Sequence, residues 1–256
     1  MSLLDPIAKL AIKRLSQVKN VILIGSGKGG VGKSVIAAGL AASLSKRYEV
    51  GVLDLDIHGP TIPLLLGLKK GLKGGREGIK PIMANKIKVM SIAFLIGERP
   101  LPLVGDEKSG IVLEFLANID WGALSYLIVD LPPGMGDEMI IPLRIFRKFR
   151  HGFVIVTIPS KLAISVARRL LKILRGERVN VLGLIENMYD IYPSERGRTE
   201  LLSMLKEFNL SLLGRIPYDP HLEEVISGRN LKTLESSKLI RCVNIISKKI
   251  ESSLPA

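Results

Sequence analysis

The chain has 256 residues, 47% of them apolar, so it can bury one substantial core without cross-links, and we expect a single domain over residues 1–256. Its only cysteine, Cys242, excludes an internal disulfide and a four-thiolate metal site built from one chain. The net charge of +13 favours a polyanionic ligand, whether nucleic acid, an acidic membrane surface or a nucleotide, without choosing among them.

The N-terminal segment, residues 1–19, predicts a helix. Its apolar residues recur at helical spacing at Ile7, Leu10, Ala11, Leu15 and Val18. No apolar stretch followed by a small-residue cleavage site precedes it, and no later run reaches the roughly 20 apolar residues of a membrane helix. We therefore expect a cytoplasmic protein.

Short apolar runs then recur along the chain and predict buried strands. They lie at residues 21–24, 50–53, 87–92, 126–129, 153–157, 179–185 and 212–216. Segments with helical periodicity separate most of them. This alternation predicts an α/β fold, a mostly parallel twisted sheet with helices on both faces.

Three further segments have a distinct pattern. Residues 161–175 predict an amphipathic helix with one face formed by Leu162, Val166, Leu170 and Ile173. Residues 236–252 predict a C-terminal helix, and residues 68–86, rich in Gly and Lys, predict a mobile loop.

The most informative motif follows the first predicted strand and opens a helix near Lys33. It consists of Gly27, Lys28, Gly29, Gly30, Val31, Gly32, Lys33 and Ser34. Such glycines let backbone N–H groups point inward around a phosphate, while the lysine neutralises the β- and γ-phosphates and the serine hydroxyl ligates Mg²⁺. The motif predicts a P-loop that binds a nucleotide.

The same stretch also fits the glycine pattern of a dinucleotide-binding oxidoreductase. Gly25, Gly27 and Gly30 have the required spacing, and Asp54 ends the next predicted strand. A pyrophosphate held by backbone amides needs neither Lys33 nor Ser34, so we keep this interpretation as the minor alternative.

Carboxylates end two other predicted strands. Asp130 follows the apolar run at 126–129, as in a Walker B strand, and can hold Mg²⁺ directly or through water. Asp54 and Asp56 end the strand at 50–53, with Asp56 expected nearer the phosphates. Carboxylates at the C-terminal ends of parallel strands beside a P-loop favour a functional site.

These motifs resemble the deviant Walker A ATPases, the ParA and MinD superfamily, because Lys28 precedes Gly29 and Gly30. The Mrp iron–sulfur cluster carriers are the most similar branch. The phrases similar to theirs occupy residues 27–34, 54–60, 88–92, 120–122, 129–137, 183–188 and 213–217. The resemblance covers roughly residues 20–230 and implies an ATP hydrolase that works as a homodimer with ATP sandwiched at the interface.

The resemblance also implies roles for single residues. Lys33 would bind phosphate, and Ser34, Asp56 and Asp130 would serve Mg²⁺, with Asp56 orienting the attacking water. Lys28 would reach the partner subunit's nucleotide. Asn187 would contact the adenine edge, with Pro217 and Tyr218 lining the base, which favours ATP over GTP because a planar amide both donates and accepts at adenine.

One departure concerns the cluster. Where Mrp carriers have a Cys-Pro-x-Cys pair, this chain has Tyr192-Pro193-Ser194-Glu195, so we do not expect an iron–sulfur cluster in the usual site. A link to iron–sulfur cluster assembly or transfer, through an unknown protein partner, remains the leading expectation. The alternatives are a ParA-like ATPase on DNA and a MinD-like ATPase on a membrane, the latter through the last helix.

Overall fold

The structure is a computed structural model that describes residues 6–57, 59–68, 74–75, 78–96, 105–191, 195–222 and 237–255. Its helices are α1 Pro6–Arg14, α2 Lys33–Leu44, α3 Ile62–Leu65, α4 Ala93–Ile96, α5 Gly105–Asn118, α6 Asp137–Phe146, α7 Lys161–Gly176, α8 Glu195–Phe208 and α11 Lys238–Ser253. Its strands are β1 Val18–Gly25, β2 Val50–Asp54, β3 Gly74–Gly75, β4 Gly78–Ile79, β5 Ile82–Ala84, β6 Ile87–Ser91, β7 Leu124–Asp130, β8 His151–Thr157, β9 Val181–Asn187 and β10 Leu212–Ile216.

The main sheet has eight strands in the order β10-β9-β8-β1-β7-β2-β6-β5. All neighbouring strands are parallel except β5 and β6, which form an antiparallel edge. The central strands are buried on both faces, which explains why they appear in the sequence as continuous apolar runs. The predicted fold class is confirmed.

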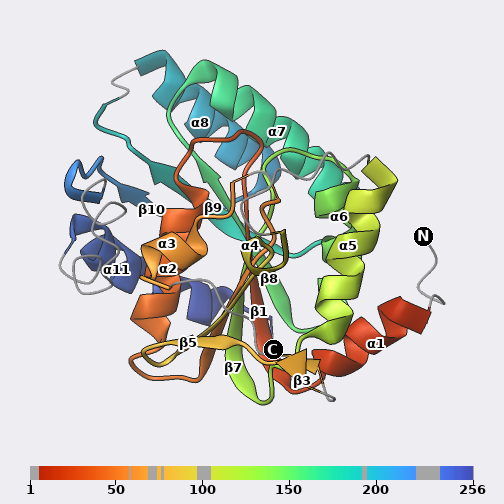
Figure 1. The fold of residues 1–256 in the computed structure, drawn as a ribbon. Coiled ribbons are helices and arrows are strands. Elements are labelled where there is room, and N and C mark those ends of the chain that lie inside the picture. The colour runs from red at the N-terminus through yellow and green to blue at the C-terminus, as the bar shows by residue number, and fades with distance from the viewer. Residues whose placement is uncertain are drawn as a thin grey trace.

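Helices cover both faces of this sheet (Figure 1). One apolar cluster joins the sheet to α1, α5, α6, α7 and α8, and a second joins it to α2, α3 and α11. Because β1 lies between β7 and β8, its C-terminal end is surrounded by the loops that follow its neighbours. This edge is where an open parallel sheet of this kind places a ligand.

Two predicted helices differ in detail from the structure. The N-terminal helix ends at Arg14, and Val18 already belongs to β1. The buried face of α7 is rotated relative to the predicted apolar face. Leu162, predicted to lie on that face, is 61% exposed, and the helix buries a different set of residues. That buried set is Ala163, Ile164, Ala167, Leu170, Leu171 and Leu174. Two small alanines let this face pack closely on the sheet and α8, a packing preference that hydrophobicity alone does not reveal.

The predicted mobile loop at 68–86 is described only in part. Residues 78–86 contribute β4 and β5, whereas residues 69–73, 76 and 77 lie outside the described residues. The mobility of this segment stays a prediction.

The C-terminal helix α11 packs against α2 and β10. Its apolar face, formed by Leu239, Ile240, Val243, Ile246 and Ile250, is buried. Within the described residues no helix is long and apolar enough to cross a membrane. The apolar face of α11 is therefore part of the core in this structure.

Candidate functional site

The loop from β1 to α2 has the shape of a phosphate cradle. Gly30 and Gly32 have φ angles of 75° and 83°, a region that favours glycine, and α2 begins directly after Gly32. A Cβ on Gly27 would lie 2.7 Å from Cγ1 of Val166 in α7, so the loop also needs glycine for close packing. The N-terminus of α2 and the loop amides thus form an anion-binding end.

Gly25, which belonged to the alternative dinucleotide pattern, has a different explanation. A Cβ at this position would lie 2.2 Å from the ring of Phe153 in β8. The residue is glycine because the neighbouring strand fills the space beside it, so the pattern requires no dinucleotide.

Strand register brings the predicted carboxylates to one place. Asp130 is the register partner of Ile24 in β1 and of Asp54 in β2, so both acids lie at the C-terminal ends of adjacent strands. Asp54 and Asp130 are completely buried and Asp56 is 8% exposed. As predicted, Asp56 lies nearer the cavity of the loop than Asp54.

The ammonium group of Lys33 lies between two of these acids. Its Nζ is 2.5 Å from Oδ1 of Asp130 and 3.7 Å from Oδ2 of Asp56. Burial raises the pKa of Asp130, opposed by the charge and hydrogen bond of Lys33 and by a hydrogen bond from Ser34. In the described part of the chain Lys33 pairs with these two carboxylates, and it lines the cavity that a phosphate would enter.

Asp54 organises the backbone that follows β2. Its Oδ1 accepts the N–H of Asp56 at 3.2 Å, and its Oδ2 accepts the N–H of Ile62 at 3.3 Å and the hydroxyl of Ser91 at 3.0 Å. Burial, followed by the nearby charge of Asp130, raises the pKa of Asp54 well above its ordinary value. Asp54 therefore fixes the position of Asp56 rather than facing the cavity itself.

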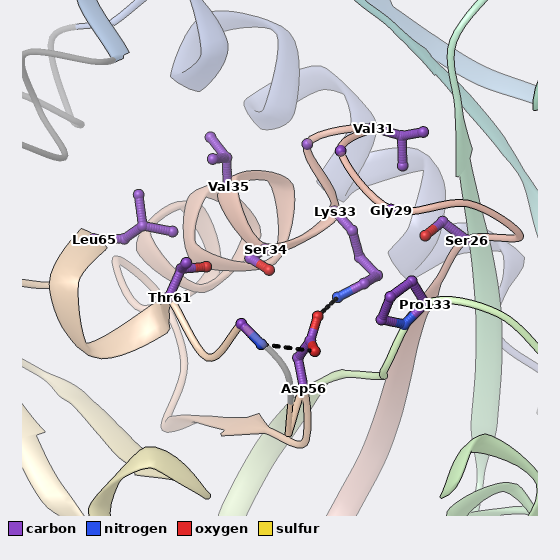
Figure 2. Close-up of a pocket in the computed structure, with 13 residues that line it drawn as sticks. Ser26, Gly29, Val31, Lys33, Ser34, Val35, Asp56, Thr61, Leu65 and Pro133 are labelled. Atoms are coloured by element: carbon purple, nitrogen blue, oxygen red, sulfur yellow. Dashed lines mark hydrogen bonds and ion pairs between the residues drawn. The ribbon is translucent and has the colours of Figure 1, made fainter. Parts of the chain in front are cut away.

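Lys33 is one of the residues that line a cavity of about 420 Å³ (Figure 2). The predicted residues that line it are Gly29, Gly30, Val31, Gly32, Lys33, Ser34 and Asp56. Gly27 packs behind the loop, and Lys28 is exposed to solvent outside this lining. The sequence analysis assigned no role to the other lining residues, which are Ser26, Val35, Gly59, Thr61, Leu65 and Pro133. Gly59 and Pro133 fall within the phrases at 54–60 and 129–137 that resemble the Mrp carriers. No motif marks Thr61 in the sequence; it reaches the cavity through the fold of the segment after β2.

A second cavity of about 180 Å³ adjoins the first and shares Gly32 and Val35 with it. Asn187, Pro217 and Tyr218 line this cavity together, and the remaining lining residues are Met188, Asp219, Leu222 and Leu239. The Nδ2 of Asn187 donates to the carbonyl of Val31 at 2.8 Å, which joins this wall to the phosphate loop. The mostly apolar lining suits a planar base beside a phosphate chain.

The oxygen groups around Lys33 suit a magnesium ion only in part. Ser34, Asp56 and Asp130 supply hard oxygen ligands, and Oδ2 of Asp130 is buried without a hydrogen-bond partner in the described part of the chain. In the whole part of the chain that the structure describes, no group of three or more His, Cys, Asp or Glu side chains could hold a metal ion. Mg²⁺ usually completes such a shell with phosphate oxygens and water, so these residues fit Mg²⁺ that arrives with a nucleotide.

The chain has only one cysteine that could supply a thiolate ligand to iron. Cys242 lies in α11, partly buried against the cluster that contains α2, and burial raises the pKa of its thiol. Residues 192–194, where the sequence departs from the Mrp cysteine pair, lie outside the described residues. Glu195 begins α8.

Sequence comparisons connect this site to known proteins. The family model described as NUBPL iron-transfer P-loop NTPase matches residues 17–251. An iron-sulfur cluster carrier protein from Synechocystis is 39% identical over 234 residues, covering 82% of this chain and 63% of that protein. The cytosolic Fe-S cluster assembly factor CFD1 from Mycosarcoma maydis is 38% identical over 237 residues, covering 84% of this chain and 66% of that protein. The chain thus spans less than two thirds of these two relatives.

Solved structures agree on the fold. The nucleotide-binding protein from Archaeoglobus fulgidus, in complex with ADP, is 32% identical with a TM-score of 0.73, covering 88% of this chain and 92% of that one. The septum site-determining protein MinD from Pyrococcus horikoshii, complexed with Mg-ADP, has a TM-score of 0.66 over 91% of this chain and 96% of its own. At 18% identity, MinD supports the fold alone.

Proposed function

Because the chain belongs to the family of NUBPL iron-transfer P-loop NTPases, we propose that it binds and hydrolyses Mg-ATP as a switch serving iron–sulfur cluster assembly or transfer. The observation that carries the proposal is the position of Lys33, whose ammonium group lies beside Asp130 and Asp56 in the phosphate-loop cavity. The cytosolic assembly factor among the relatives supports the cytoplasmic location expected from the sequence.

In this proposal the larger cavity binds the phosphates and Mg²⁺, and the smaller cavity binds the base. The loop amides and Lys33 bind the phosphates, and Ser34 and Asp130 hold Mg²⁺, which neutralises charge on the phosphate oxygens. Asp56, beside Lys33, would orient the attacking water and would also serve Mg²⁺. Asn187, Pro217 and Tyr218 receive the base, and the amide of Asn187 favours adenine over guanine.

The exposed Lys28 is the feature that points to a dimer. Lys33 already supplies the cation inside the cavity, whereas Lys28 lies outside it and faces solvent. We assign Lys28 to the nucleotide of a second copy of the chain, where it would act like an arginine finger supplied in trans. ATP would then close a sandwich homodimer, and hydrolysis would release it.

The iron–sulfur cluster enters this scheme as cargo. A [4Fe–4S] cluster takes four thiolates, and a homodimer of this chain offers two copies of one cysteine, Cys242. That thiol is partly buried and its pKa is raised, which disfavours the thiolate form that binds iron. We therefore assign the cluster ligands to a partner protein that carries cysteine thiolates.

Phosphate release from ATP tests the enzymatic part of the proposal. The purified chain should hydrolyse ATP in the presence of Mg²⁺ and should prefer ATP to GTP. Lys33→Ala should abolish tight ATP binding, because the terminal phosphates lose a direct counterion in a buried site, an effect of several kcal/mol. Undiminished ATP affinity in this variant would refute the assignment.

Anaerobic reconstitution with iron and sulfide tests the cargo assignment. We expect no stable cluster on the chain alone, measured by absorbance and metal content. About four irons per dimer would show that the chain holds a [4Fe–4S] cluster itself.

One observation favours a second candidate, a ParA-like ATPase that acts on DNA. The outward stripe of α7 carries Lys161, Arg169, Lys172 and Arg175, all exposed. DNA binding through such a stripe should weaken steeply with salt in the ATP-loaded protein. Absent or salt-insensitive binding would remove this candidate. The membrane alternative has lost its support, since the apolar face of α11 is buried in the core.

A further inference from the structure

Thr61 presents an unused hydroxyl to the phosphate cavity. It lies at the N-terminus of α3, lines the cavity with Ser34 and Asp56, and points towards Ser34 in Figure 2. Although it holds the N-cap position, its side chain makes no capping hydrogen bond. Its hydroxyl therefore lacks the backbone partner that an N-cap threonine usually has.

The backbone around Thr61 is fixed by contacts that do not involve a ligand. Asp54, completely buried, accepts the N–H of Ile62 at 3.3 Å. Ile62 and Leu65 are both buried, and Leu65 also lines the cavity. The N–H of Leu65 donates to the carbonyl of Thr61 at 3.0 Å. These contacts place the backbone of Thr61 at the cavity wall without a nucleotide.

The wall that carries Thr61 lines the same cavity as the phosphate loop. Asp56 and Thr61 both follow β2, whereas Gly29, Gly32 and Lys33 belong to the loop and the start of α2. The terminal phosphate of a chain cradled by the loop amides would lie beside Lys33 and Ser34, which line the same cavity as Thr61. A threonine hydroxyl can donate a hydrogen bond to a phosphate oxygen there, or accept coordination from Mg²⁺ on that oxygen.

We propose that Thr61 is a further ligand of the terminal-phosphate end of Mg-ATP, with Asp54 as the positioning residue that holds it in place. This proposal rests on the proposed function and deepens it, because it gives the site a group that distinguishes ATP from ADP. Ser34, by contrast, lies at the start of α2 and serves Mg²⁺ with either nucleotide.

The test compares equilibrium binding of ADP and of a non-hydrolysable ATP analogue, both with Mg²⁺, to the full chain. Thr61→Val keeps the shape of the side chain and removes the hydroxyl. It should weaken binding of the ATP analogue by roughly tenfold or more and leave ADP affinity within about twofold, as expected for a lost hydrogen bond to a charged group. Thr61→Ser should restore most of the difference, and Ser34→Ala should weaken both nucleotides.

Leu64→Ala is the matched control, since Leu64 lies in the same helix, is 37% exposed and does not line the cavity. It should leave both affinities unchanged, and thermal unfolding of each variant checks the fold. If Thr61→Val keeps the parent ratio of the two affinities, whether by losing neither or by losing both equally, the assignment of Thr61 is overturned. If the parent chain binds neither nucleotide, the proposed function itself fails.

Discussion

Lys33 lies between two buried or nearly buried carboxylates, and a phosphate entering the cavity competes with them for its ammonium group. In the proposed Mg-ATP complex, Asp130 would hold Mg²⁺, whose charge would replace that of Lys33 beside this carboxylate. Removing one member of such a buried pair leaves an uncompensated charge, which is costly. Under the proposed function, Lys33, Asp130 and Asp56 would therefore act together on a Mg-nucleotide.

The role proposed for Asp56 predicts different effects on ATP binding and on hydrolysis. Asp56→Ala should leave Mg-ATP bound while slowing hydrolysis by about 100-fold or more, since orienting the water contributes to the transition state rather than to ground-state binding. Single-turnover phosphate release, compared with equilibrium ATP affinity, measures the two effects separately. Turnover at the parent rate would mean that another residue orients the water.

Asp54 predicts how stability depends on pH. Burial raises its pKa well above the ordinary value of 3.8, so the folded protein binds this proton more tightly than the unfolded chain does. The stabilisation is complete below the ordinary pKa and is lost as pH rises through the raised one. The urea midpoint of the nucleotide-free protein should fall over that range, and Asp54→Asn should reduce the slope. An unchanged slope would show that Asp54 does not titrate in this way.

Residue types and spacing predicted much of the site. The P-loop, Asp130 and Asp56 could be named because their chemistry is local to strand ends, and the structure brings them together. The network that holds Asp54 could not, because it depends on Ser91 from β6 and on the backbone of Ile62. The hydroxyl of Thr61 matters only once the fold directs it into the cavity.

At the scale of elements, α11 shows how burial decides between two interpretations of one amphipathic helix. Its apolar stripe suits a membrane surface as well as a core, but in the structure it packs on α2 and β10. A Cβ on Gly214 would lie 2.5 Å from Cγ1 of Ile246, so helix and strand approach closely at this point. The helix belongs to the apolar cluster that also contains α2, the helix that begins at the end of the phosphate loop.

Two neighbouring isoleucines in α11 test this packing. Ile246 is 1% exposed and Ile245 is 63% exposed. Ile246→Ala should lower the free energy of unfolding by about 2–4 kcal/mol, because it leaves a cavity between helix and strand. Ile245→Ala, the control, should change it by less than about 0.5 kcal/mol. Equal effects in chemical denaturation would contradict the observed orientation.

Apolar periodicity predicted the parallel strands well but missed the short elements. The antiparallel β5 has three residues, and α3 and α4 have four each, too few to produce a recognisable period. The rotated face of α7 was missed for a different reason. Alanine, which the structure buries at Ala163 and Ala167, contributes little to a hydrophobic pattern.

At the scale of the whole molecule, the two cavities and the exposed Lys28 lie on the phosphate-loop edge of the sheet. Lys28→Ala should bind ATP nearly as well as the parent, because Lys33 remains in the cavity. It should lose both turnover and ATP-dependent dimerisation, as measured by phosphate release and analytical ultracentrifugation. Normal hydrolysis by a monomeric Lys28→Ala variant would rule out a role in trans.

The most direct test of an ATP-driven dimerising switch is to mix two inactive variants. An Asp56→Ala subunit keeps Lys28 and a Lys28→Ala subunit keeps Asp56, so each mixed dimer has one complete site if Lys28 acts across the interface. Random mixing of equal amounts should restore about a quarter of the parent's phosphate release, on the premise that one trans lysine suffices to close the dimer. If the mixture stays inactive although mixed dimers are shown to form, the account of an ATP-driven dimer with a trans lysine is wrong.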